Sequence, residues 1–366
     1  MAKIILSFVL IVALLGSVPL AAQDKNKNRT QFLVLPAVSY SPETELQLGA
    51  VGFLVIKRDS IPDSTQVNRP ITINPWIIYS LRKQLEANID VEYFFKNGDF
   101  FKVSTRYFNF PDLFYGIGPD SELADEESFT NEAIYLETNY LRMYNNEVFY
   151  GFATDIRHDV LFDLEEDGSL TEAEIKGQDG GFLAGFGPSF RFDSRDDVLY
   201  PSKGILFEFN GLYYPRLSSG KYSYGSFQFD YRQYLKIKNE RNILAWQILL
   251  NLTSGRDIPF YKLPRIGGSK RLRGISHYNR FLDRQAFYTQ VEYRKKLFWR
   301  IGAVVFAGMG NVAPSPGEFS FNQTEYVFGL GGRFQVFKDQ GMNVRIDLGF
   351  SGGGENGLYF QVREAF

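Results

Sequence analysis

The feature that most constrains the fold of this chain is a period-two alternation of apolar and polar side chains, repeated in segment after segment. Between Leu85 and Lys96, the odd positions are all apolar or aromatic, and the even positions are polar or charged except for Phe94. The segments 227–232 and 342–348 alternate in the same way. Successive side chains of a β-strand point to opposite faces, so these segments predict strands with one apolar face and one polar face.

Such strands fit two architectures, because a soluble sandwich buries its apolar faces and a membrane barrel turns them to lipid. The N-terminus favours the barrel. Lys3 precedes an apolar run over 4–15, and small residues stand before Gln23, a pattern typical of a secretory signal peptide. A buried helix or a membrane anchor is the alternative, but the run is shorter than the ~20 residues of a spanning helix. We therefore expect a signal peptide over 1–22, a polar lead-in over 23–30 and a barrel over 31–366.

The composition and the C-terminus agree with a barrel in a Gram-negative-type outer membrane. The chain has 35 Phe, 22 Tyr and 34 Gly but no cysteine, and its net charge of -2 gives no sign of a nucleic-acid partner. The alternation predicts about 16 antiparallel strands, an even number as in closed bacterial barrels, with periplasmic termini and longer loops outside. The last predicted strand, 358–366, places Phe360, Val362 and Phe366 on one face, which resembles the C-terminal recognition signal of such barrels.

A glycine-rich basic segment lies in the long connection after the eleventh predicted strand. It runs from Gly267 to Ile275 and includes Lys270, Arg271 and Arg273. One interpretation is a solvated basic loop. The other is a loop that folds back into the barrel, where a guanidinium bridges inward carboxylates by bidentate hydrogen bonds. A glycine after the last arginine would let the backbone turn tightly there.

These residues resemble the BamA/TamA-type outer-membrane assembly barrels, also called the bacterial surface antigen superfamily. The resemblance rests on several matches along the chain, namely Arg271-Leu272-Arg273-Gly274, Asp193 to Asp197 followed by Tyr200 to Gly204, Phe306 to Val312, Gly329 to Arg333, and Asp347 to Gly349. It implies an all-β transmembrane barrel whose sixth extracellular loop enters the lumen and whose first and last strands meet in a weak seam. In this comparison Arg273 is the loop arginine, with Glu292 and Asp347 as its inward acidic partners. The chain departs from the family at Gly308, where an aspartate is common.

The resemblance also implies a function without catalytic residues. Opening the seam exposes strand edges, which can template an incoming strand during insertion or translocation of outer-membrane proteins. The expected partners are outer-membrane lipids, unfolded client proteins and periplasmic or lipoprotein accessory factors. Family members usually carry periplasmic polypeptide-transport-associated domains, and the early start of the alternation leads us to expect none in this chain.

An acidic segment after the seventh predicted strand fits the spacing of a calcium loop. Side chains of alternate residues and the carbonyl of Ser169 would supply the oxygen ligands, with Gly168 at the turn. The predicted side-chain ligands are Asp163, Glu165, Asp167 and Glu174. The alternative is a solvated acidic loop.

Two other function classes remain open at this stage. An outer-membrane hydrolase would need His158 to work with Asp155 or Asp159, but the sequence places no serine beside them. A passive pore or structural barrel is compatible with a polar inner face. Single-channel conductance would discriminate a pore from a barrel plugged by its own loop.

Overall fold

The computed structural model describes residues 30–41, 45–56, 70–172, 175–217, 221–336 and 342–366. The predicted signal peptide and almost all of the lead-in lie outside the described residues. Within the described part, no helix is both long and apolar enough to cross a membrane.

The described residues form sixteen strands, which confirms the all-β architecture and the expected strand number. The strands are β1 (Thr30–Ser41), β2 (Glu45–Ile56), β3 (Ile71–Ser80), β4 (Leu85–Phe94), β5 (Phe100–Phe114), β6 (Glu127–Met143), β7 (Val148–Phe162), β8 (Gly181–Asp193), β9 (Gly204–Tyr214), β10 (Ser223–Lys236), β11 (Asn242–Asp257), β12 (Gln285–Phe298), β13 (Ile301–Ala313), β14 (Glu325–Gln335), β15 (Asn343–Ser351) and β16 (Asn356–Val362). Short helical turns stand in the connections, namely η1 (Leu123–Asp125), α2 (Ser169–Glu172), η2 (Phe260–Lys262) and η3 (Phe321–Gln323).

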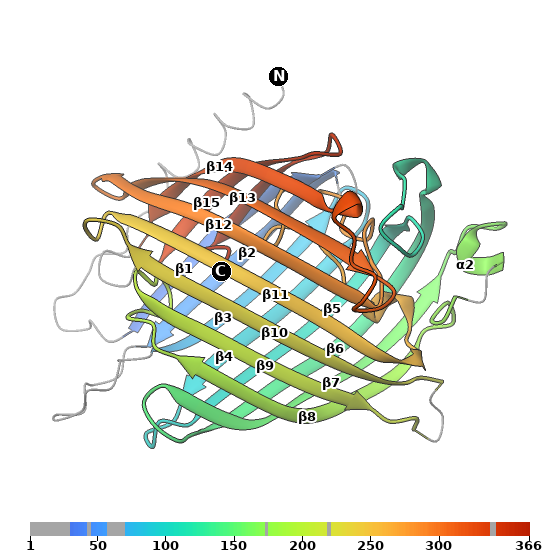
Figure 1. The fold of residues 1–366 in the computed structure, drawn as a ribbon, viewed down its shortest axis with the longest axis horizontal. Coiled ribbons are helices and arrows are strands. Elements are labelled where there is room, and N and C mark those ends of the chain that lie inside the picture. The colour runs from blue at the N-terminus through green and yellow to red at the C-terminus, as the bar shows by residue number, and fades with distance from the viewer. Residues whose placement is uncertain (1–29, 42–44, 57–69, 173–174, 218–220, 337–341) are drawn as a thin grey trace.

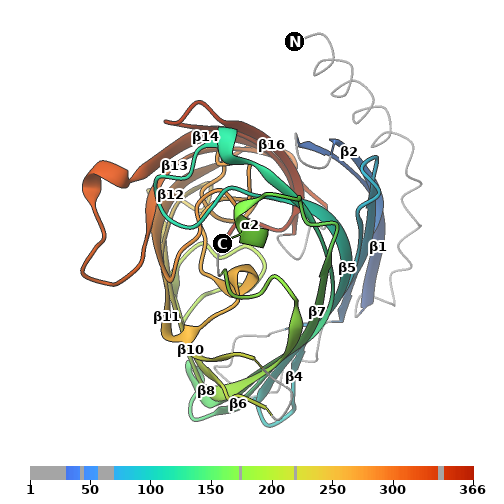
Figure 2. The same cartoon turned by 90° about the vertical axis from the view of Figure 1, so that its right-hand side faces the viewer.

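Each strand pairs antiparallel with the next, and the ladder closes into a barrel (Figures 1 and 2). Because successive strands run in opposite directions, all connections that follow even-numbered strands lie at one end. We call this the turn end; it carries the connections 95–99, 144–147, 194–203, 237–241 and 299–300. The opposite end, the loop end, carries the longer connections 115–126, 163–180, 258–284 and 314–324, together with the short connection 352–355.

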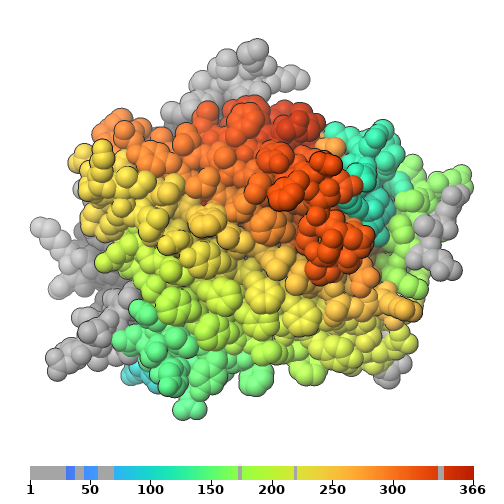
Figure 3. All heavy atoms as spheres, in the orientation of Figure 1, coloured from blue at the N-terminus to red at the C-terminus, as the bar shows by residue number. Residues whose placement is uncertain are grey.

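The alternation sorts side chains into an apolar outer face and a polar inner face. On the outside, Phe152 is 70% exposed and Phe328 59% exposed, as expected of side chains that face lipid. On the inside, charged side chains such as Arg294, Arg345 and Asp347 are buried. The outer wall over β9 to β12 is continuous in the space-filling view (Figure 3). The inner wall of this barrel therefore carries many buried charged side chains.

The barrel closes weakly at one place. Strands β1 and β2 pair over the whole of β1, from Thr30 to Ser41, and β15 and β16 pair over seven positions. Between β1 and β16, the described residues form a single pair, Tyr40 with Leu358. This unsealed seam is the junction with the fewest ladder hydrogen bonds to break.

The C-terminal segment differs from the prediction. Strand β16 ends at Val362, and Arg363 adopts a left-handed backbone with a φ of 69°. The chain then turns into the barrel, where Phe366 packs on Tyr234 and Ala245. The prediction that Phe366 shares the outward face with Phe360 and Val362 was wrong, because buried arginines of the inner wall hold the last residues inside.

Candidate functional site

The connection 258–284, here called the lumen loop, lies inside the ring of strands when the barrel is viewed from the loop end (Figure 2). Its tip carries Leu272 and Ile275, both completely buried. They belong to an apolar cluster with Leu249, Ile266, Phe281, Ala286, Tyr288, Val312 and Val327. Burial of these apolar side chains gives the loop a fixed seat against the inner surface of β11, β12, β13 and β14.

Arg273 lies at the centre of this docked tip. Its Nη1 donates to Asp347 Oδ2 on β15 at 2.6 Å, and its Nη2 donates to Glu292 on β12. The guanidinium also stacks over the ring of Phe306 on β13, with 3.8 Å between the guanidinium carbon and the ring centroid. The structure therefore brings together the three residues that the sequence singled out. Charge-assisted hydrogen bonds of this kind fix both the position and the orientation of a loop.

The same carboxylates bind further arginines. Asp347 also accepts from Arg333 at 2.5 Å and from Arg345, and Glu292 accepts from Arg294 at 2.7 Å. The network continues to the C-terminal segment, because Arg333 Nε donates to Glu364 at 2.7 Å and Arg294 donates to the carbonyl of Phe366 at 2.9 Å. One buried network thus joins the lumen loop, the wall beside the seam and the chain after β16.

Two glycines permit the loop to approach β15 closely. Gly274 has a φ of 138°, and a Cβ there would lie 2.7 Å from the backbone carbonyl of Phe350. A Cβ at Gly349, on β15, would overlap the carbonyl group of Arg273. Gly274 therefore adopts a backbone conformation that favours glycine, and it also lets the main chain of the loop contact the main chain of β15.

The departure from the family at Gly308 has a steric reason. A Cβ at Gly308 would lie 2.8 Å from one methyl group of Leu272, and a Cβ at Gly310 would lie 2.6 Å from the other. The space above β13 is thus filled by the loop's own leucine. An aspartate at Gly308 would displace this leucine.

A second anchor of the lumen loop escaped the sequence analysis. Glu355, in the connection between β15 and β16, accepts from the backbone N–H of Ser276 at 2.9 Å and contacts His277 Nδ1 at 2.8 Å. It also pairs with Arg280. Burial alone would raise the pKa of Glu355, but the hydrogen bonds from His277 and Arg280 lower it to about 2. No motif marks this residue, since its partners lie more than seventy positions away in the chain.

The predicted calcium loop is described only in part. Glu165 accepts from the backbone N–H of Ser128 at 3.0 Å, and Asp163 accepts from the hydroxyl of Thr130 at 3.4 Å. Glu174 lies outside the described residues. Within the described part of the chain, no three His, Cys, Asp or Glu side chains are grouped to hold a metal ion. Calcium binding stays a prediction.

The arrangement required for a hydrolase is not formed. His158 is exposed on the outer face of β7, whereas Asp155 and Asp159 are buried on the inner face. Asp159 pairs with Arg157, and Asp155 accepts from Lys262 at 2.6 Å. The histidine and the aspartates therefore lie on opposite sides of the wall.

A sixteen-stranded antiparallel barrel with a docked lumen loop and an unsealed seam defines an outer-membrane β-barrel. The profile of the Omp85 superfamily domain matches residues 68–363, so the chain belongs to the Omp85 superfamily.

Two solved structures share this fold at low sequence identity. The first is BamA from Haemophilus ducreyi lacking POTRA domains 1–3, with a TM-score of 0.57 and 12% identity over 92% of this chain and 70% of that chain. The second is CdiB from Acinetobacter baumannii, with a TM-score of 0.55 and 10% identity over 92% of this chain and 59% of that chain. The match thus covers less than two thirds of CdiB. A search of the curated proteins found no match.

Proposed function

We propose that this barrel inserts polypeptides into the outer membrane, or moves them across it, by opening the seam between β1 and β16. The observation that carries the proposal is the single pair between these strands, Tyr40 with Leu358. Every other junction pairs over six or more positions, so opening this one breaks the fewest hydrogen bonds. The freed edge of β1 would then offer its backbone groups to an incoming strand.

The proposal includes an orientation. The turn end and the C-terminus face the periplasm, and the loop end faces outward, as in other bacterial barrels with long outer loops. Unfolded outer-membrane proteins would then reach the turn end first, alone or with periplasmic or lipoprotein accessory factors. A client strand would pass between β1 and β16 into the lipid beside the seam.

A passive pore is less well supported, because the lumen loop lies inside the barrel and is tied to two walls. A plugged barrel should show small, fluctuating conductance in single-channel recordings. A large steady conductance would favour the pore.

A disulfide across the seam tests the proposal, since the chain has no cysteine of its own. The pair Tyr40→Cys with Leu358→Cys would lock β1 to β16, and the pair Leu348→Cys with Leu358→Cys would link β15 to β16 as a matched control. We expect the seam-locked variant to lose the ability to maintain its client proteins, measured by outer-membrane proteomics after depletion of the wild type. Reduction should restore it. Full complementation by the locked, oxidised variant would refute a seam mechanism.

A further inference from the structure

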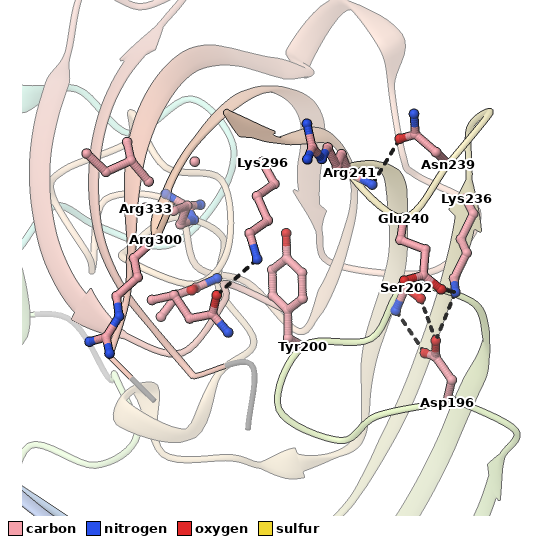
Figure 4. A pocket seen from close by; sticks show the side chains of 14 residues that line it. Asp196, Tyr200, Ser202, Lys236, Asn239, Glu240, Arg241, Lys296, Arg300 and Arg333 are labelled. Carbon is pink, nitrogen blue, oxygen red and sulfur yellow. Dashed lines mark hydrogen bonds and ion pairs between the residues drawn. The ribbon is translucent and has the colours of Figure 1, made fainter. Parts of the chain in front are cut away.

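A cavity of about 690 Å³ opens at the turn end of the barrel (Figure 4). Its wall is built from the connections after β8, β10 and β12 and from the adjoining ends of β14 and β15. Because inward-facing residues such as Arg333 and Asn343 line it, the cavity belongs to the mouth of the lumen and not to the lipid-facing surface.

The lining has an excess of positive charge. Five basic residues, Lys236, Arg241, Lys296, Arg300 and Arg333, stand against two acidic residues, Asp196 and Glu240. Both acidic residues lie beside the same lysine, because Lys236 Nζ is 2.9 Å from Glu240 and 3.9 Å from Asp196.

Three of the cations have no carboxylate partner among the described residues. Lys296 donates to the side-chain oxygen of Gln335 at 3.3 Å, and Arg300 donates to the backbone carbonyl of Val336 at 3.2 Å. In the described ranges, neither these two nor Arg241 has a carboxylate within 4 Å. Like charges gathered around a cavity repel each other, so an anionic ligand would be stabilised there.

The inner wall of the cavity already binds a carboxylate of a peptide segment. Glu364, from the chain after β16, accepts from Arg333 Nε and from Asn343 Nδ2, each at 2.7 Å. Arg333 is only 5% exposed, yet its Nη2 is buried without a partner in the described structure. Tyr200 adds a neutral hydroxyl donor, because burial and the nearby Glu364 carboxylate raise its pKa to about 12.

We infer that this cavity is a binding site for acidic segments of an extended polypeptide, whose carboxylates pair with Arg241, Lys296 and Arg300. The chain's own Glu364 shows the chemistry that the inner wall accepts. The free cations come from the connection after β10 and from the β12–β13 hairpin, which suits several carboxylates along a peptide better than one compact phosphate. The site would gather acidic client segments at the lumen mouth, a role that rests on the proposed function.

Peptide binding to the full-length barrel in nanodiscs of neutral phosphatidylcholine tests the inference. The probe is a fluorescent peptide in which glutamates alternate with apolar residues, and a matched peptide carries glutamine instead. The site variant combines Arg241→Gln, Lys296→Gln and Arg300→Gln. The control variant combines Lys96→Gln, Arg142→Gln and Lys238→Gln, which removes the same charge from exposed residues outside the cavity lining.

We expect the glutamate peptide to bind the wild type and the control variant alike, and to bind the site variant about tenfold more weakly. The glutamine peptide should bind none of them. A second variant, with Arg241→Lys and Arg300→Lys, should keep the affinity and so separates loss of charge from loss of fold.

Three results would overturn the inference. One is an equal loss in the control variant, which would mean attraction to general surface charge. Another is displacement of the peptide by inorganic phosphate at low millimolar concentration, which would mean a phosphate site. The third is binding only in nanodiscs that contain anionic lipid. Because peptide binding is measured without insertion, it can succeed in the seam-locked variant even where client insertion fails.

Discussion

Replacing Arg273 by alanine tests how far docking of the lumen loop depends on its buried arginine. The change removes charge-assisted hydrogen bonds to Asp347 and Glu292 and a stacked contact with Phe306. Such hydrogen bonds contribute about 1.5–3 kcal/mol each, and a desolvated cation over a ring contributes about 2 kcal/mol. The sum of these contributions overstates the loss of docking free energy, because both carboxylates keep other arginine partners.

The balance of charges in the network lowers the expected loss of docking free energy further. Four guanidinium groups, those of Arg273, Arg294, Arg333 and Arg345, face three carboxylates, those of Glu292, Asp347 and Glu364. Removing Arg273 leaves three of each, so no buried carboxylate becomes uncompensated. We therefore expect docking of the tip to weaken by about 3 kcal/mol, which corresponds to roughly a hundredfold larger undocked population.

Trypsin measures that population, because Lys270 and Arg271 stand at the tip of the loop. Where opening and closing are faster than cleavage, the cleavage rate follows the undocked fraction. Cleavage after these residues should accelerate roughly a hundredfold in Arg273→Ala and stay at the wild-type rate in Arg256→Ala, which changes an exposed arginine at the end of β11. If Arg273→Ala resists trypsin as well as the wild type does, the buried ion pairs do not hold the loop, and the reasoning fails.

Two further predictions concern the same loop. Gly274→Ala should undock the tip, because a Cβ there meets the backbone of Phe350. Gly354 also has a positive φ but lies in open space, so Gly354→Ala should lower the stability by only about 1 kcal/mol. The trypsin assay compares the two variants directly. Acidification should release the segment 275–281. Glu355 has a pKa of about 2, below the ordinary value of 4.5, so its contribution is complete above about pH 4.5 and is lost as the pH falls towards 2. Hydrogen exchange of this segment should rise over that interval in the wild type; a Glu355→Gln variant should exchange fast already at neutral pH, and an unchanged pH profile in that variant would argue against this anchor.

The alternation of side chains was enough to predict most of the fold. Period two fixes which residues of a strand share a face, so the inward positions of Glu292 and Asp347 could be counted from the sequence. Arg273 could be singled out as well, because its motif resembles the loop of the assembly barrels, whereas its basic, glycine-rich context alone left a solvated loop open. These features depend on local geometry and on residue type.

The same counting failed at the C-terminus and could not find the cavity. Parity holds only while the strand continues, and β16 ends at Val362 because Arg294 and Arg333 hold the following residues in the lumen. Glu355 carries no sequence signal of its role. Arg241, Lys296 and Arg300 carry none of a shared site, since Arg241 lies in the connection after β10 and the other two lie in the β12–β13 hairpin. The sequence by itself therefore determined the strands, their two faces and the charged positions of the inner wall. Only the closed barrel decided which of those charges meet, because closure sets the register that brings distant connections to one end.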